Sequence, residues 1–341
     1  MKSAFSGYAA LVMSTALTIG CDGTDPSVET VELSKTSSPL SYSGIYQYSD
    51  WSGNVVMSIF QCSWVNSTTP LEKVGAQCPV GAGYVLVGGG AQVAGPWDEN
   101  PSLNPGALLT MSESGDDFKT WYAEAKESQY QNPNGFRVRA YAIGMKLKRA
   151  NGTYLTEDEM KSQMWVDHSP YPHDRVAHPS RLYQMNESSQ YRTGDVLLGG
   201  GAHTVFYGDG NFLTQSLPWQ GGWYAEAKDH LVSDPAFFSV KVIAIRPCPA
   251  TWGYCLQSSV FANDSLMFMD SGTRLSVRNI AASNWATSSI GGLNAYRGAG
   301  RMMTNLIPTM SDGGGSTFWT KDHGVADTGL QSSFLIAVAR Q

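Results

Sequence analysis

The hexapeptide WYAEAK occurs twice in this chain, at residues 121–126 and again at residues 223–228. A third stretch, FWTKDH at 318–323, ends in the same letters, Lys-Asp-His, that begin at Lys228. A phrase that recurs three times in one chain indicates an internal repeat, and the residues around it show how far the repeat extends.

The segments on either side of the phrase also recur. Upstream lie VLVGGGA at 85–91, VLLGGGA at 196–202 and a weaker SIGGLNA at 289–295, and downstream lie RVRAYAIGM at 137–145, SVKVIAIR at 239–246 and FLIAVAR at 334–340. The interval from lysine to a downstream alanine is 16 residues in each copy, from Lys126 to Ala142, Lys228 to Ala244 and Lys321 to Ala337. This equal spacing predicts that the three lysines are equivalent and that the three alanines are too.

The repeated segments favour β-strands. WYAEAK alternates large and small residues, as a strand with one buried face does. Its Ala, Glu and Lys also suit a short helix, but FWTKDH lacks that helix propensity, so strand is preferred. We therefore expect Trp121, Trp223 and Trp319 to be buried between sheets.

The repeats define three units, at about residues 76–148, 190–248 and 283–341. One unit of three or four short strands cannot bury its own apolar face, whereas three units packed together can. The sequence thus predicts an all-β body in a pseudo-threefold arrangement that is β-prism-like, with a trefoil-like arrangement as the alternative. The plan resembles that of three-sheet prism lectins, but no motif of their sugar sites is present.

Composition and charge narrow the function classes. The chain has 341 residues, of which 42% are apolar and only 15% charged, with a net charge of −6. Nucleic-acid binding requires clustered Lys and Arg to neutralise phosphates, and no basic run is present. A nucleic-acid partner is therefore not expected.

The first 21 residues have the layout of an export signal. Lys2 precedes an apolar stretch at 9–19 that is too short for a membrane-spanning helix. The end of this stretch, TIGC, resembles a bacterial lipoprotein signal and would make Cys21 the lipidation site; the alternative is an ordinary signal peptide cut near Ala16 or Gly20. Residues 22–41 are polar and predict a flexible tether before a β-rich body at 42–341. We expect a location in the cell envelope or outside the cell, with the lipid as the only membrane contact.

Four cysteines remain in the predicted body: Cys62, Cys78, Cys248 and Cys255. An even number in an exported chain favours disulfide bonds. Pairing of sequence neighbours, Cys62 with Cys78 and Cys248 with Cys255, is the simplest of three connectivities.

The Lys-Asp-His step is the first candidate site. It occurs at Lys228, Asp229 and His230 and again at Lys321, Asp322 and His323, which makes these six residues candidate ligand contacts. A catalytic group usually occurs once, so recurrence favours ligand binding or a structural turn in which the aspartate accepts backbone amides.

A second candidate combines three histidines with an aspartate, namely His168, His173, Asp174 and His178. Imidazole and carboxylate are common ligands of divalent metals such as zinc, so the cluster is a candidate metal site. No other cofactor is expected. The alternative is a polar, proline-rich surface connector.

Tryptophans outside the phrase form the third candidate set. Trp51, Trp64, Trp97, Trp165, Trp219, Trp252 and Trp285 include several beside Pro or Gly in expected loops. Exposed aromatic rings beside polar side chains bind sugars by stacking on their C–H faces, and the alternative role is anchoring of the core and loops.

Together these features favour an exported, lipid-anchored surface protein that binds carbohydrate or another surface polymer. No catalytic residue is assigned, because no GxSxG or similar nucleophile motif is present. The alternatives are a secreted hydrolase that uses the cluster at 167–178 and a structural envelope lipoprotein.

Overall fold

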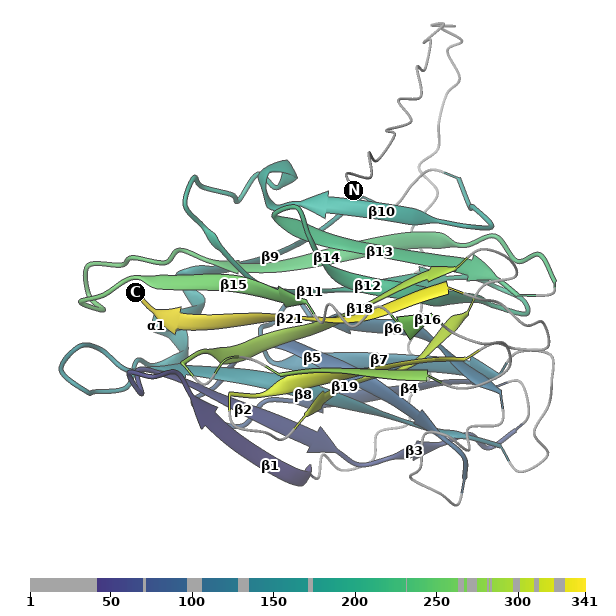
Figure 1. Ribbon diagram of the computed structural model, residues 1–341, viewed down its shortest axis with the longest axis horizontal. Coiled ribbons are helices and arrows are strands. Elements are labelled where there is room, and N and C mark those ends of the chain that lie inside the picture. The colour runs from purple at the N-terminus through teal and green to yellow at the C-terminus, as the bar shows by residue number, and fades with distance from the viewer. Residues whose placement is uncertain are drawn as a thin grey trace, which may run out of the picture. The chain divides into compact units, whose positions relative to one another are not determined.

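The fold is all-β and consists of three sheets of antiparallel strands (Figure 1). The computed structural model describes residues 42–69, 72–96, 106–127, 135–170, 174–230, 232–262, 267–268, 275–280, 282, 284–296, 301–309, 313–321 and 329–341. Contacts divide the chain into residues 1–33 and residues 34–341, and every described residue lies in 34–341. The expected signal, the tether and Cys21 lie outside these ranges.

The two copies of WYAEAK are strands. They lie in β7 (Thr120–Glu127) and β13 (Gly222–Asp229), which confirms the preference for strand over helix. The described part of the third phrase lies in β20 (Gly315–Lys321), whereas Asp322 and His323 fall outside the described residues.

The strands form sheets of eight, six and seven members, here called sheets 1, 2 and 3. Sheet 1 has the order β1 (Tyr42–Ser49), β2 (Val55–Cys62), β8 (Arg137–Leu147), β5 (Val85–Ala94), β19 (Met302–Thr309), β20 and β17 (Leu275–Ile280), with β3 (Val65–Asn66) beside β8. Sheet 2 has the order β4 (Lys73–Pro79), β7, β6 (Ala107–Ser114), β11 (Val196–Val205), β14 (Phe237–Ile245) and β9 (Met164–His168). Sheet 3 has the order β10 (Ser180–Gln184), β13, β12 (Asn211–Trp219), β18 (Ala286–Tyr296), β21 (Gly329–Arg340) and β15 (Leu256–Ala262), with β16 (Met267–Phe268) beside β21.

The sheets exchange strands between the three units of the sequence. In sheet 1 the outer strands of the first unit, β5 and β8, join the middle strands of the third, β19 and β20. In sheet 2 the middle strands of the first unit, β6 and β7, join β11 and β14 of the second. In sheet 3 the middle strands of the second unit, β12 and β13, join β18 and β21 of the third, so every sheet needs two units.

The register of these strands is the same in each unit. The first strand of each unit is β5, β11 or β18, and a bulge interrupts it just after Leu86, Leu197 and Thr287, respectively. The second strand is β6, β12 or β19, and a bulge interrupts it just after Leu109, Leu213 and Met303. The pairs that join one unit to another, Ala202 with Ser112, Gly292 with Ser216 and Ala91 with Leu306, lie at the same distances from these bulges.

The lysines of the repeated phrase also share one position. The cross-strand partners of Lys126, Lys228 and Lys321 are Leu108, Phe212 and Met302, respectively. Each partner lies two residues before the bulge in the second strand. Those three partners are fully buried and form a small core of their own, separate from the main one. One residue from each unit therefore contributes to this second core.

The predicted equivalence of the three alanines is wrong for the first unit. Ala244 and Ala337 pair with Leu197 and Thr287 at the first-strand bulge, but the residue there in the first unit is Gly144, opposite Leu86. Since Gly144 lies two residues beyond Ala142, the connection from Lys126 is longer by two residues in that unit.

The tryptophans of WYAEAK fill the space between sheets, as expected. Trp121 and Trp223 are almost completely buried, and their indole N–H groups donate to the hydroxyls of Ser112 and Ser216. The ring of Trp223 covers Gly200, where an added Cβ would lie only 2.5 Å from it. A glycine is therefore needed for the ring to approach the backbone of β11 in the other sheet.

Trp319 corrects the same prediction, because it is only half-buried. Trp223 lies five residues before its lysine, whereas Trp319 lies two before Lys321, and this odd difference turns the side chains to opposite faces of the strand. Phe318 is the buried residue here, and its ring covers Gly292.

The connector between the first two units holds more structure than a loop. Besides β9 and β10 it contains α1 (Glu157–Lys161) and a 3-10 helix at Met185–Glu187. Thr156 caps α1: its hydroxyl accepts from the Glu159 N–H, and the Glu159 carboxylate accepts from the Thr156 N–H.

Both expected disulfides are present. Cys62 and Cys78 have Cα atoms 5.4 Å apart, and they link β2 of sheet 1 to β4 of sheet 2. Cys248 and Cys255 have Cα atoms 4.3 Å apart and close the turn that precedes β15.

Candidate functional site

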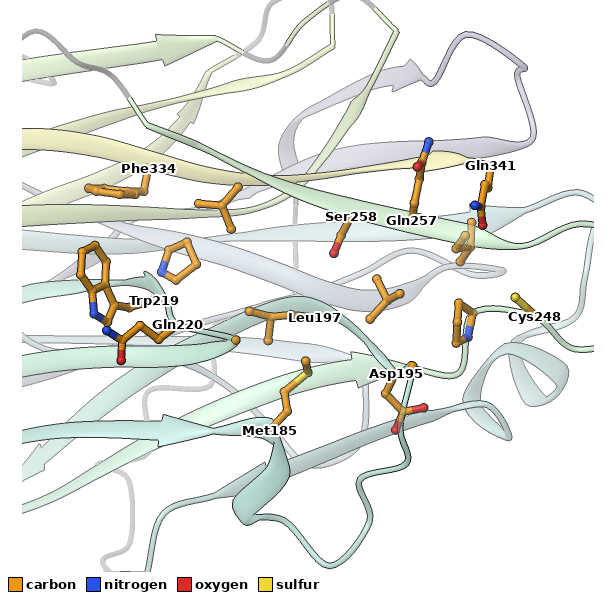
Figure 2. A pocket seen from close by; sticks show the side chains of 17 residues that line it. Met185, Asp195, Leu197, Trp219, Gln220, Cys248, Gln257, Ser258, Phe334 and Gln341 are labelled. Atoms are coloured by element: carbon orange, nitrogen blue, oxygen red, sulfur yellow. The ribbon is translucent and has the colours of Figure 1, made fainter.

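An open groove of about 730 Å³ lies where β12, β15 and β21 of sheet 3 meet the first residues of β11 (Figure 2). Its lining consists mainly of apolar side chains with a few amides and one hydroxyl. The lining residues are Met185, Gly194, Asp195, Val196, Leu197, Pro218, Trp219, Gln220, Gly221, Pro247, Cys248, Leu256, Gln257, Ser258, Val260, Phe334 and Gln341. A concave apolar surface with a few polar groups is the usual form of a ligand site.

Trp219 is the largest exposed side chain of the groove. It ends β12, and the two-residue turn Gln220–Gly221 leads directly into β13. Both turn residues have positive φ, 46° and 74°, as a tight hairpin connection requires. The tryptophan stays 47% exposed, and in Figure 2 it lies at one end of the groove near Phe334. Its indole face is therefore accessible to a flat apolar partner.

Asp195 is the one charged side chain in the lining of this groove. Its Oδ2 accepts from the indole N–H of Trp165 at 2.8 Å and from the Arg192 N–H at 3.0 Å. These bonds hold the carboxylate in place. With no cation among the lining residues, the groove favours uncharged ligands over anionic ones.

The amides of Gln220, Gln257 and Gln341 and the hydroxyl of Ser258 complete the polar part of the lining. Figure 2 shows Gln257 and Ser258 on the side of the groove opposite Met185, and Gln220 beside Trp219. Amide and hydroxyl groups both donate and accept hydrogen bonds, so they can pair with a ligand hydroxyl that acts either as a donor or as an acceptor.

The four Lys-Asp-His residues that the structure describes do not line the groove, and Asp322 and His323 fall outside the described residues. Lys228 and His230 are buried, and the ammonium of Lys228 lies 5.4 Å from the centre of the Tyr296 ring. Asp229 accepts from His178 Nε2 at 2.9 Å. The burial of Lys228 and His230 favours the structural alternative over a ligand contact, while Lys321 is half-buried.

The histidine cluster is dispersed as far as it is described. His168 Nδ1 lies 3.1 Å from the Ser169 carbonyl oxygen, and His178 pairs with Asp229, while Asp174 is exposed and His173 is outside the described residues. Across the ranges that the structure covers, no three His, Cys, Asp or Glu side chains are placed to bind a metal ion.

A second polar group lies on sheet 2, away from the groove. Lys241 Nζ donates to the Ser114 carbonyl at 2.9 Å and to Asp116 at 3.1 Å, and it lies 3.5 Å from the Glu113 carboxylate. Burial raises the pKa of Glu113, although Lys241 opposes this. Burial alone would lower the pKa of Lys241, but the carboxylates of Glu113 and Asp116 outweigh it and raise that pKa. The engaged, charged amine forms a structural ion pair and is no nucleophile.

His203 lies beside this ion pair, with Nδ1 3.9 Å from Glu113 Oε1. Burial, assisted by the positive charges of Lys73 and Lys241, lowers the pKa of His203 to about 3. The imidazole is therefore neutral at pH 7 in the folded state.

No family model matches the chain, and no curated protein matches it. Within the part of the chain that the structure describes, no helix is long and apolar enough to cross a membrane.

Sequence reasoning singled out Trp219 but not the residues that form the groove around it. Asp195 and Leu197 lie far from Phe334 in the chain, and they meet it only because β11 of sheet 2 packs against β21 of sheet 3. The available signal was the stretch PWQGG at 218–222, in which an aromatic residue sits at a glycine-containing hairpin turn.

Proposed function

We propose that this protein binds carbohydrate through the groove beside Trp219. The observation that carries the proposal is an exposed indole at the edge of an apolar groove whose remaining polar groups are amides, a hydroxyl and one carboxylate. Pyranose rings stack their C–H faces on such an indole while their hydroxyls bond to the polar groups. A neutral surface polysaccharide is the ligand class that matches this chemistry.

We further propose that the chain is exported and held at the cell surface by lipid on Cys21. Two disulfides in the body support an oxidising compartment, because such bonds are rare in reducing ones. A lipid-anchored binding protein would present its groove to polymers of the envelope. The hydrolase alternative, which needs the cluster at 167–178, has only the pair of His178 and Asp229 among the described residues in its favour.

The body itself is proposed to be a three-unit, prism-like arrangement with a pseudo-threefold axis. The matching bulges, the matching inter-unit pairs and the second core of Leu108, Phe212 and Met302 support this proposal. Trp219 breaks the pattern, since Gly115 and Thr309 stand at its register position in the other two units. A single carbohydrate site is therefore expected, in the second unit.

Carbohydrate binding is tested with the purified chain on a glycan array, followed by titration calorimetry with the best neutral glycan. Trp219→Ala should weaken binding about tenfold, since the apolar contact between the indole and the sugar C–H face is expected to contribute about 1.4 kcal/mol. The matched control is Trp51→Ala, because Trp51 is also exposed, at 65%, but does not line the groove. Equal binding by the two variants would refute the groove as the site, and an empty array would favour the structural envelope alternative.

A further inference from the structure

In two of the three units, a backbone carbonyl in the loop between the second and third strands accepts a hydrogen bond from a backbone N–H near the start of the first strand. The Leu86 N–H donates to the Phe118 carbonyl at 2.8 Å, and the Thr287 N–H donates to the Gly313 carbonyl at 3.0 Å. Leu86 and Thr287 each precede the first-strand bulge, so they hold the same register position. An amide carbonyl thus occupies the same place in both units.

Leu197 holds this position in the second unit, but the hairpin tip there is bonded elsewhere. The Gln220 carbonyl accepts from the side-chain amide of Gln184 at 3.0 Å, and the Gly221 carbonyl accepts from the Met185 N–H at 3.2 Å. Leu197 makes no backbone bond to this turn, and all of these residues belong to the described ranges. The Leu197 N–H therefore receives no carbonyl from the Gln220–Gly221 turn, unlike the corresponding N–H groups of Leu86 and Thr287.

The difference arises from the length of the hairpin connection. Five residues, 115–119, join β6 to β7, and Phe118 among them packs against the main core. Only Gln220 and Gly221 join β12 to β13. The longer loop brings its own aromatic ring and carbonyl to the first strand, whereas the shorter turn leaves the groove open at Leu197.

We propose that the groove binds N-acetylated hexosamine units, with the acetamido carbonyl oxygen accepting from the Leu197 N–H. This rests on the proposed carbohydrate-binding function and names its substrate class. The acetamido group is a secondary amide, so its carbonyl is chemically the same acceptor that Phe118 and Gly313 present in the other units. Leu197 and Trp219 both line the groove, and Figure 2 shows Leu197 between Trp219 and Cys248, so a glycan that fills the groove would contact both residues.

The remaining lining agrees with this ligand. The acetamido methyl group is apolar and matches the apolar floor to which Leu197 and Leu256 contribute. The ligand is uncharged, as the lack of a cation in the lining favours. A hexose without the acetamido group could still stack on Trp219 but would leave the carbonyl position empty.

The test compares two β-1,4-linked oligomers of equal length, one of N-acetylglucosamine and one of glucose, by titration calorimetry with the full chain. The acetylated oligomer should bind about five- to tenfold more tightly, the factor expected for one net hydrogen bond. Trp219→Ala should weaken both oligomers, whereas Trp51→Ala should weaken neither. In ¹⁵N-labelled protein, the acetylated oligomer alone should shift the Leu197 amide resonance downfield.

The outcomes separate the two proposals. Equal affinity for both oligomers, with no selective shift at Leu197, would overturn the acetamido contact and leave carbohydrate binding intact. Tighter binding of the glucose oligomer would overturn it as well. If neither oligomer binds but the array yields another neutral glycan that Trp219→Ala abolishes, the N-acetyl specificity fails and the groove stands.

Discussion

Replacing Trp223 with alanine is expected to lower the free energy of unfolding by about 3–5 kcal/mol, the range for emptying a large aromatic site in a core. The side chain is 0% exposed, so all of its apolar surface returns to water on unfolding. Its indole N–H donates to the Ser216 hydroxyl at 2.8 Å, and the substitution leaves this hydroxyl without that partner.

The contact between Trp223 and Gly200 makes the prediction more specific. A Cβ added at Gly200 would lie 2.5 Å from the Trp223 ring and 2.5 Å from the Lys241 carbonyl oxygen. In the otherwise unchanged protein, Gly200→Ala should therefore lower the free energy of unfolding by about 1–3 kcal/mol, the usual effect of overpacking a core. In the Trp223→Ala background the ring contact is gone and only the carbonyl contact remains, so the same change should cost less.

The assay is chemical denaturation followed by far-UV circular dichroism for both single variants and the double variant. The double variant should be more stable than the sum of the single effects predicts, by about 0.5–3 kcal/mol. Trp121→Ala combined with Gly200→Ala is the control, since Trp121 covers Gly89 instead, and these effects should add. A loss below about 1 kcal/mol for Trp223→Ala, or additive effects in the test pair, would refute the reasoning.

Three further predictions concern stability. Replacing Cys62 and Cys78 together by alanine should lower the free energy of unfolding by about 3 kcal/mol, measured by denaturation without reductant, because the bond closes a loop with a sequence separation of 16; an unchanged midpoint would contradict this. Lys241→Met should destabilise the fold by about 3–5 kcal/mol where Glu113 is ionised, because it leaves that buried carboxylate without its partner, and the loss should shrink as the pH falls and Glu113, whose pKa burial raises, becomes protonated; a pH-independent loss would count against the ion pair. His203 has a pKa depressed to about 3 in the folded state, below its unfolded value, so the unfolded chain binds more protons between these values and stability should fall as pH drops from about 6.5 towards 3. His203→Gln should remove about one proton from that slope in denaturation at several pH values, and an identical slope would show that other groups set it.

The elements that could be predicted from sequence are those whose signals are local. Strand periodicity in WYAEAK and the pairing of neighbouring cysteines both depend on residues close in the chain. The structure bears out both. The burial of Trp319 failed for an equally local reason, because matching the copies on their shared lysine ignored which face the tryptophan occupies.

Strand exchange has no local signal, and the one local signal of the groove, an aromatic residue at the short PWQGG turn, does not identify the distant residues that complete it. The pairing of Ser216 with Gly292 is made by backbone groups, which every residue carries, so side-chain patterns do not reveal it. The groove depends on the short turn at Gln220–Gly221, and its effect appears only beside the longer loop at 115–119. The sequence of the short turn alone therefore does not indicate that it leaves a groove.

The exchange of strands constrains the order in which the molecule can be completed during synthesis. Sheet 1 joins β5, made early, to β19, made near the end, and the Val93 N–H at this seam donates to Asn305 Oδ1 at 2.6 Å across a separation of 212 residues. Until the last unit has been synthesised, β5 has an unpaired edge, and exposed edges of this kind promote aggregation. Contacts so distant in sequence also slow folding. A nascent chain of this protein must therefore keep its first β-sheet unfinished, and shielded from other chains, until its final strands arrive.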